Sequence, residues 1–326
     1  MRAAGQTGVA LALMLATSCT GEQTSPNTGI GEPLRIESGQ FVPGLLPGSL
    51  QLAADASPDA GVDPQVTDVN VANTAIEPGE LGLVFSGHAT TDAQTVGLRF
   101  ADMGTGYWVV PVGAPDPTDE GLLTWQASAD FGRDLTPGFH DLVFATISAD
   151  GSSGTQSDLP VCIDTPVPDN LNICVPKRPP PAAVLSLSWD RPVNLDLIVE
   201  DPSGVVVGGV TASSRPPDAG VAASTSNGVL DRDSNANCVI DGIDREDLVW
   251  QSTPATGQYQ VWVDLFGACG QPAVTFSVSL WLAEAQPDGT QRLVQQVPPL
   301  ATGVLTADQA NGGSGLGLFV GDFVLK

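Results

Sequence analysis

Lysine and histidine are almost absent from this sequence. Lysine occurs only as Lys177 and Lys326, histidine only as His88 and His140, and the formal net charge is −25. Nucleic acid and anionic membrane surfaces are bound through basic patches, so this composition excludes nucleic acid as a partner. An acidic protein of this kind favours divalent cations instead.

Long runs of good helix-forming residues are also missing. The 326 residues include 37 glycines and 27 prolines, which interrupt helices and favour turns. This composition is typical of a loop-rich, all-β protein, and the length suffices for two domains with separate cores.

A short apolar stretch near the N-terminus, residues 9–16, precedes Cys19. It is too short to cross a bilayer, which takes about 20 residues, and it is typical of an export signal. Residues 1–18 resemble a bacterial lipoprotein signal, although Ala16 stands where leucine or valine is usual. An ordinary secretory signal followed by an incidental cysteine is the alternative.

The lipoprotein resemblance carries a prediction about location. It implies that Cys19 becomes lipidated and anchors the protein in a membrane. Thr20, and not aspartate, follows the cysteine, which resembles the outer-membrane class of lipoproteins. We therefore expect an exported, outer-membrane-anchored protein that faces the periplasm or the cell surface.

Four cysteines remain after Cys19, and an even number in an exported chain predicts two disulfides. Three pairings are formally possible, and the one that keeps each bridge local joins Cys162 to Cys174 and Cys238 to Cys269. A zinc site is the competing interpretation, but the sequence has no CxxC pair and no histidine near these cysteines.

The first part of the chain is predicted to be a tether followed by a sandwich. Residues 19–63 are rich in serine, proline and glycine, as tethers are, although the apolar residues 41–48 suggest a segment that docks on the first domain or binds a partner. Residues 64–160 alternate apolar and polar side chains between regular turns, which predicts an immunoglobulin-like β-sandwich. Residues 137–154 resemble the last hairpin of bacterial immunoglobulin-like modules.

The second part is predicted to be a linker and another sandwich. Residues 161–181 form a proline-rich linker that the Cys162–Cys174 bridge would stiffen. Residues 182–326 contain further strands of period two, above all 259–265 and 274–280, which predict a second two-sheet sandwich.

Short motifs in the second sandwich resemble a known family. They are Trp189, Asn194-Leu195-Asp196-Leu197, Asp201-Pro202-Ser203-Gly204, Leu230-Asp231-Arg232-Asp233, Glu246-Asp247-Leu248 and Gly257-Gln258-Tyr259-Gln260-Val261. In this order they resemble YfaP-type secreted bacterial modules over residues 184–282, which are similar to pre-peptidase C-terminal and collagen-binding domains. The resemblance implies a non-catalytic, jelly-roll-like sandwich that binds calcium. Asn194, where aspartate is common, and the Asn-Cys segment before Glu246 depart from the pattern.

Residues 230–250 crowd six carboxylates into one acidic stretch, and such carboxylates repel one another unless a hard cation screens them. We therefore predict a calcium site. Its candidate ligands are Asn194, Asp196, Asp231, Asp233, Asp241, Asp244 and Glu246.

Two ligand spacings compete within this set. In an EF-hand-like spacing, Asp233, Asp241 and Asp244 take positions 1, 9 and 12 of a loop, but Cys238 replaces the glycine of position 6. In the spacing that the family resemblance implies, Asp231, Asp233 and Glu246 converge with Asn194 and Asp196 from a neighbouring strand. The second is favoured because it needs only a β-sandwich. A solvated acidic loop without an ion is the alternative to both.

No catalytic motif accompanies these carboxylates, and we expect no enzymatic activity. The predicted function is a cell-envelope lipoprotein whose calcium-ordered module binds polysaccharide or protein. Exposed aromatic side chains, Trp262 and the pair Tyr107 and Trp108, are candidates for stacking on sugars or for packing between domains. The alternatives are a purely structural envelope lipoprotein and, third, a glycosidase or an accessory of a secreted hydrolase.

Overall fold

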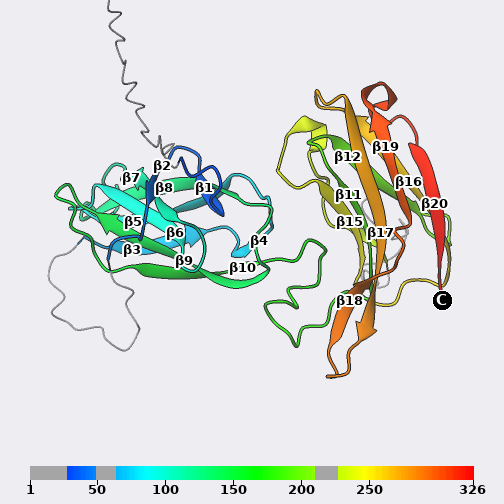
Figure 1. The fold of residues 1–326 in the computed structure, drawn as a ribbon, viewed down its shortest axis with the longest axis horizontal. Helices are drawn as coiled ribbons and strands as arrows, with labels where there is room; N and C mark the ends of the chain where they lie inside the picture. The colour runs from blue at the N-terminus through cyan, green and yellow to red at the C-terminus, as the bar shows by residue number, and fades with distance from the viewer. Residues whose placement is uncertain (1–27, 49–63, 210–226) are drawn as a thin grey trace, which may run out of the picture.

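The computed structural model describes residues 28–48, 64–209 and 227–326. Nearly all of its regular structure is β-strand, and the strands form two β-sandwiches that lie side by side in Figure 1. Each sandwich encloses its own cluster of buried apolar side chains. The predicted all-β sandwich fold is confirmed. The predicted signal and Cys19 lie outside the described residues.

The first sandwich packs a four-stranded sheet on a six-stranded one. The smaller sheet has the order β1 (Leu34–Ile36), β8 (Leu122–Phe131), β5 (Leu83–Thr90), β3 (Val66–Val71). The larger has the order β2 (Gln40–Pro43), β7 (Gly106–Pro111), β6 (Thr95–Phe100), β9 (Gly138–Ile147), β10 (Ser157–Ile163), β4 (Ala75–Ile76). Phe85, Leu98 and Phe144 are fully buried between the sheets, as their alternation predicted.

Part of the predicted tether belongs to this sandwich. β1 pairs antiparallel with β8, and β2 pairs antiparallel with β7. Phe41 packs on Trp108 with ring centroids 5.4 Å apart, and the Trp108 indole donates a hydrogen bond to the Leu34 carbonyl. Residues 28–48 are therefore folded rather than tethering, because even these short strands satisfy the edge of each sheet.

The second sandwich is also built from two antiparallel sheets. One has the order β14 (Val229–Leu230), β15 (Arg245–Trp250), β11 (Ala183–Trp189), β17 (Ala273–Ala285), β18 (Gln291–Gln295), with β19 (Ala301–Thr306) also paired to β17. The other has the order β13 (Val206–Val207), β12 (Asn194–Glu200), β16 (Gly257–Gly267), β20 (Leu318–Leu325). Two short 3₁₀ helices, η1 (Ala236–Cys238) and η2 (Ala307–Gln309), lie in loops.

The alternation along β16 decides which side chains face the core. Tyr259, Val261 and Val263 point inward and are buried, whereas Trp262 lies on the other face of the strand. There Trp262 packs edge-on against Phe319 of β20, 5.5 Å between ring centroids. Trp262 thus has a partner on its own sheet, and Trp108 of the first sandwich is buried in the core.

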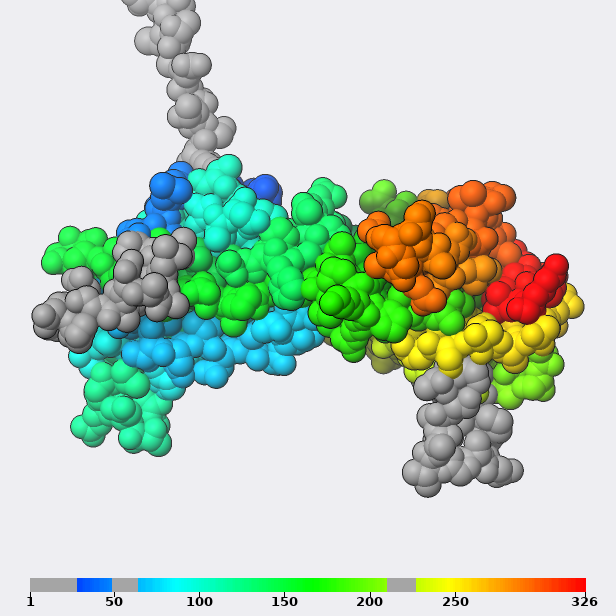
Figure 2. Space-filling model, turned by 90° about the horizontal axis from the view of Figure 1, so that it is seen from below, coloured from blue at the N-terminus to red at the C-terminus, as the bar shows by residue number. Residues whose placement is uncertain are grey.

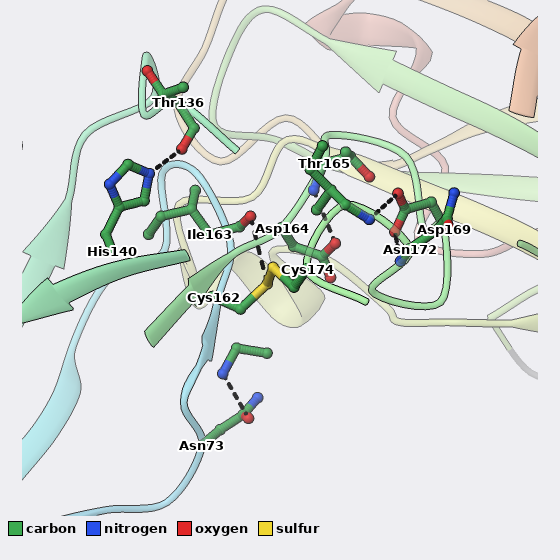
Figure 3. The surroundings of a disulfide bond; sticks show 12 residues. Asn73, Thr136, His140, Cys162, Ile163, Asp164, Thr165, Asp169, Asn172 and Cys174 are labelled. Atoms are coloured by element: carbon green, nitrogen blue, oxygen red, sulfur yellow. Dashed lines mark hydrogen bonds between the residues drawn. A yellow bond between two sulfur atoms is a disulfide. The ribbon is translucent and has the colours of Figure 1, made fainter. Parts of the chain in front are cut away.

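Both predicted disulfides form between the expected partners, Cys162 with Cys174 and Cys238 with Cys269. Figure 3 shows the first of these where β10 leaves the first sandwich and the linker begins. Asp169 fixes the linker's turn by accepting hydrogen bonds from the backbone N–H groups of Asn172 and Ile173.

The linker lies against the second sandwich. Asn172 donates a hydrogen bond to the Gln291 carbonyl of β18, 3.2 Å away, and the green linker touches the orange β17–β18 hairpin in Figure 2. Asn170 donates a second one to Gln251, which follows β15. The linker is therefore a packed part of the molecule, as the predicted stiff linker requires.

The two sandwiches also meet directly through charged side chains. Arg133 of the first sandwich pairs with Asp244 at 2.6 Å, and Glu77 receives both Arg232 and Arg245 of the second. Glycine at position 242 permits the close approach, since a Cβ there would lie 2.2 Å from the Gly79 carbonyl oxygen. The acidic stretch of the sequence thus forms one side of the contact between the sandwiches.

Candidate metal centre

Three carboxylates meet at one end of the second sandwich. Asp196 comes from β12, Glu246 from β15, and Asp233 from the loop that joins β14 to β15. One oxygen of each lies within 4.8 Å of the others. Oxygens bound to one Ca²⁺ at about 2.3–2.6 Å can be at most about 5 Å apart, so a single ion can contact all three.

Burial makes this arrangement costly without a cation. Glu246 has no solvent exposure and Asp196 is 8% exposed, while Asp233 is exposed. Among the described residues, no lysine, arginine or histidine forms an ion pair with any of the three. A buried carboxylate in this position must take up a proton or bind a metal ion.

The pKa values reflect this cost. Loss of hydration on burial and, to a smaller extent, the nearby charges of Asp233 and Asp264 together raise the pKa of Asp196 to about 7. Burial likewise raises the pKa of Glu246 well above its usual range, against the two backbone hydrogen bonds that it accepts. When no cation is bound, Asp196 therefore takes up a proton near neutral pH, and Glu246 holds its proton more tightly than an exposed glutamate does.

Hydrogen bonds hold the carboxylates in place. Glu246 accepts from the Leu197 backbone N–H through Oε2 at 2.8 Å and from the Ser234 N–H through Oε1 at 3.3 Å. With its amide oriented to suit both neighbours, Asn194 donates to Asp196 Oδ1 at 3.0 Å and accepts from the Asn237 N–H at 3.1 Å. Asn194 thus orients Asp196 instead of supplying an oxygen to the centre.

A fourth carboxylate, Asp264 of β16, borders the centre and was not among the predicted ligands. It lies directly across the strand pair from Asp196. It is 1% exposed, its Oδ1 accepts from Asn311, and its Oδ2 has no hydrogen-bond partner among the described residues. The sequence alone gave no signal for Asp264. Its position opposite Asp196 becomes apparent only when the register of β12 and β16 is known.

The remaining predicted ligands lie outside this group. Asp231 accepts from the Asp247 backbone N–H at 2.9 Å, and Asp241 accepts from the Ile243 N–H at 2.9 Å. Asp244 pairs with Arg133 and accepts from Asn235 at 3.2 Å. These carboxylates belong to the loop's own structure and to the contact between sandwiches.

The geometry distinguishes the two predicted spacings. The strand-based spacing brings together Asp196, Asp233 and Glu246, but not Asp231. The EF-hand-like spacing is not formed, because its position-12 residue Asp244 is engaged by Arg133. Cys238 nevertheless adopts a positive φ of 61°, the conformation for which glycine is usual at position 6 of such a loop.

The cysteine bridge closes the loop beside the centre. Cys238 ends η1, and its partner Cys269 follows β16, two residues after Gly267. Asn235, which precedes η1, and Asn237, which lies within it, also have positive φ, at 56° and 52°. Asparagine tolerates this region better than most residues, which explains why the loop carries them.

Neither histidine lies at this centre. His88 contacts Asp68 and Asp116, and His140 contacts Asp102 and the Thr136 carbonyl, all within the first sandwich. The donor set of the centre is therefore oxygen alone, which suits Ca²⁺ or Mg²⁺ better than zinc.

Known proteins resemble this chain only weakly. No protein-family model and no curated protein matches the sequence. The dimeric latent PorU of Porphyromonas gingivalis is 11% identical with a TM-score of 0.23, and the match covers 76% of this chain and 21% of PorU. BcpA, the major pilin subunit of Bacillus cereus, is 10% identical with a TM-score of 0.20, covering 76% of this chain and 68% of BcpA. The fibronectin(III)-like modules of Clostridium thermocellum CbhA are 12% identical with a TM-score of 0.19, covering 74% of this chain and 95% of theirs.

The chain thus spans about a fifth of the length of PorU. The YfaP-type resemblance stays a prediction that these comparisons do not confirm. Within the described ranges, no helix is long and apolar enough to cross a membrane. The disulfides are typical of proteins that leave the reducing cytoplasm. The two disulfides thus indicate an exported protein, and its strands form two β-sandwiches.

Proposed function

We propose that this protein is a non-catalytic component of the cell envelope whose second sandwich is ordered by a bound calcium ion. One observation carries the proposal: Asp196, Asp233 and Glu246 converge within 4.8 Å, with two of them buried and none paired to a basic side chain among the described residues. Calcium fits because it prefers oxygen ligands and tolerates irregular geometry, whereas Mg²⁺ demands a near-ideal octahedron.

The envelope location rests on the sequence. The lipoprotein-like signal and Cys19 support a lipid anchor in the outer membrane, and the two disulfides support an oxidising compartment. The role that follows is to present a binding module for polysaccharide or envelope protein away from the membrane. Labelling with radioactive palmitate, lost in Cys19→Ser, tests the anchor.

A purely structural role is the second candidate, and the contact between the sandwiches favours it. Glu77 and Arg133 form ion pairs with Arg232 and Asp244, which lie in the same loop as Asp233. In that case the ion would stiffen the molecule without any ligand. A glycan and envelope-protein array, run with calcium and with chelator, separates a binding module from a purely structural one.

Thermal unfolding tests the calcium site. We expect millimolar calcium to raise the melting temperature of the second sandwich, because an ion that binds only the folded state stabilises it by mass action. The rise should disappear in Asp233→Asn, which keeps the size of the side chain and removes its charge. Asp322→Asn, on exposed β20 of the same sandwich, is the matched control and should keep the full rise.

Two outcomes would count against the proposal. If calcium leaves the melting temperature of the native protein unchanged, the carboxylates are neutralised by protons and the site does not bind calcium. If hydrolysis of a glycan is found and is lost in Glu246→Gln without a change in stability, the site is catalytic instead.

A further inference from the structure

A cavity of about 360 Å³ opens beside the carboxylate centre. Asp196, Asp233 and Asp264 lie in its wall, and Gly208 and Gly209 form part of its rim. Small-molecule sites in proteins typically measure about 300–1,000 Å³, so the space is large enough for a ligand and far exceeds one water molecule.

The centre leaves room on the ion for such a ligand. Ca²⁺ takes about six to eight oxygens, whereas Asp196, Asp233 and Glu246 each bring one oxygen to the common centre. Glu246 lies inside the sandwich and Asp196 faces the cavity, so further oxygens can approach the ion from the cavity side. About three to five coordination positions would then be filled by water or by a ligand.

The charge of the cavity selects a neutral ligand. The described residues that line it include three aspartates and no lysine, arginine or histidine. One Ca²⁺ would leave the surroundings of Glu246 and these aspartates negative, so a carboxylate or phosphate ligand would be repelled. A ligand that binds here must offer oxygen atoms without carrying negative charge.

Another part of the cavity wall is apolar. Phe266 of β16 and Leu316 lie in its wall, and a Cβ added at Gly313 would lie 2.8 Å from the Phe266 ring. The absence of a side chain at Gly313 therefore allows its loop to pack closely against the Phe266 ring. A neutral molecule with hydroxyls on one side and an apolar C–H face on the other matches both walls, and a sugar ring has that form.

We propose that this cavity binds a neutral saccharide whose two adjacent hydroxyls contact the ion held by Asp196, Asp233 and Glu246. The inference rests on the calcium site proposed above and names the class of ligand that the site takes. Asp264 borders the same space and can accept a hydrogen bond from a sugar hydroxyl, because its Oδ2 has no partner among the described residues.

Calorimetric titration of the full chain tests the inference with defined probes. These are the methyl glycosides of mannose, galactose and glucose, each with calcium and with chelator. At least one should bind, and chelation should weaken it by at least about tenfold. The fully O-methylated glycosides, which keep the ring but lose the hydroxyls, should not bind.

Gly209→Leu blocks the cavity without removing any ligand of the ion. A Cβ at this position would lie 3.5 Å from Asp196 Oδ2, an ordinary contact, so the longer side chain occupies the space beside it. Saccharide affinity should fall by at least about tenfold while calcium affinity stays within about twofold. Gly31→Leu, in open space in the first sandwich, is the matched control and should change neither.

A second variant tests the same cavity independently in case Gly209→Leu does not fold. Phe266→Ala removes the apolar wall and should weaken the saccharide while calcium still raises the melting temperature. Calcium binding without binding of any glycoside would overturn this inference and leave the proposed calcium site standing. Saccharide binding that persists in chelator, or binding of a neutral penta-alanine amide in place of sugars, would also overturn it. Failure to bind calcium at all would defeat the proposed function itself.

Discussion

At the scale of single residues, the second sandwich is unusual for its buried carboxylates, among them Asp196 and Glu246. A strand side chain with no exposure is ordinarily apolar, yet Glu246 lies on the inner side of β15 beside Leu248 and Trp250, which belong to the core. Its two backbone hydrogen bonds offset part of the cost of burial, but not the charge. Without a bound cation, the buried carboxylates of the centre therefore lower the free energy of unfolding.

This cost predicts an unusual dependence on pH. The pKa of Asp196 is raised from 3.8 to about 7, so the folded protein binds more protons than the unfolded chain between these values. Without calcium, stability should therefore fall as the pH rises from about 4 to about 7. With calcium the fall should be smaller, because the ion replaces the proton at the centre, while groups outside it such as Asp231 still contribute. Melting temperatures with chelator and with calcium, at about pH 5.5 and about pH 8, check both statements. A chelated protein that is more stable at the higher pH would contradict them.

Residue identity alone predicted the centre only in part. Asp233 and Glu246 could be found from sequence because clustered carboxylates between strands are conspicuous, and Asp196 because its motif resembles the YfaP-type modules. Asp264 could not, because it stands alone among apolar neighbours and its relation to Asp196 depends on strand pairing. Asp244 was misassigned for the complementary reason, since its partner Arg133 lies 111 positions away in the chain.

At the scale of elements, the disulfide between Cys238 and Cys269 ties the loop of the centre to the end of β16. Its separation of 31 residues corresponds to about 4 kcal/mol of loop-closure entropy in the chain-entropy model. The Cys162–Cys174 bridge, with a separation of 12, corresponds to about 3 kcal/mol. Both are local, which is why the pairing could be predicted from spacing.

Only one of the two bridges should matter for calcium. Replacing Cys238 and Cys269 by serine should lower the free energy of unfolding by about 4 kcal/mol and weaken calcium by at least about tenfold, because Asp233 loses its fixed position. Replacing Cys162 and Cys174 by serine is the control, with a similar loss of stability and unchanged calcium affinity. Isothermal titration with calcium distinguishes them, and equal calcium affinities in both variants would refute the role of the loop.

The short strand β1 could not be predicted from the composition of its segment. Residues 19–63 were predicted as a tether because polar and turn-forming residues dominate, and three residues of alternation are too few to stand out. Leu34 and Ile36 are nevertheless 2% and 1% exposed, and their pairing with β8 supplies the reason. Strands of this length are defined by the sheet edge that receives them.

Alanine substitutions measure the contribution of β1. Leu34→Ala and Ile36→Ala should each lower the free energy of unfolding of the first sandwich by about 2–5 kcal/mol, the usual cost of emptying a core position. Ile30→Ala, at a side chain that is 84% exposed, should change it by less than about 0.5 kcal/mol. Urea unfolding followed by tryptophan fluorescence provides the measurement, since Trp108 and Trp125 lie in the core of the first sandwich. Equal and negligible effects at all three positions would show that the segment is a free tether.

At the scale of the whole molecule, the sandwiches are joined both by the packed linker and by ion pairs. Arg133 is 61% exposed on its side chain, but its partner Asp244 is only 3% exposed. Removing the arginine would leave a buried carboxylate whose other contact is Asn235. The cost therefore exceeds that of an ordinary surface pair.

Arg133→Ala should loosen the arrangement of the sandwiches without unfolding either one. Small-angle scattering should show a larger radius of gyration and a broader distribution of distances, and the same change should appear in the native protein at high salt. Arg35→Ala, a substitution of an exposed arginine on β1, should leave the scattering curve unchanged. Identical curves for all three proteins would mean that the linker alone fixes the arrangement.

The order of residues in the loop has a mechanical consequence. Arg232 precedes Asp233 and Arg245 precedes Glu246, so each arginine that holds Glu77 is the chain neighbour of a carboxylate of the centre. An ion that draws the two carboxylates together also fixes the backbone from which both guanidinium groups extend. Loss of the ion would loosen the ion pairs with Glu77 and allow the two sandwiches to move relative to each other. The reach of the molecule would then vary with the calcium concentration outside the cell.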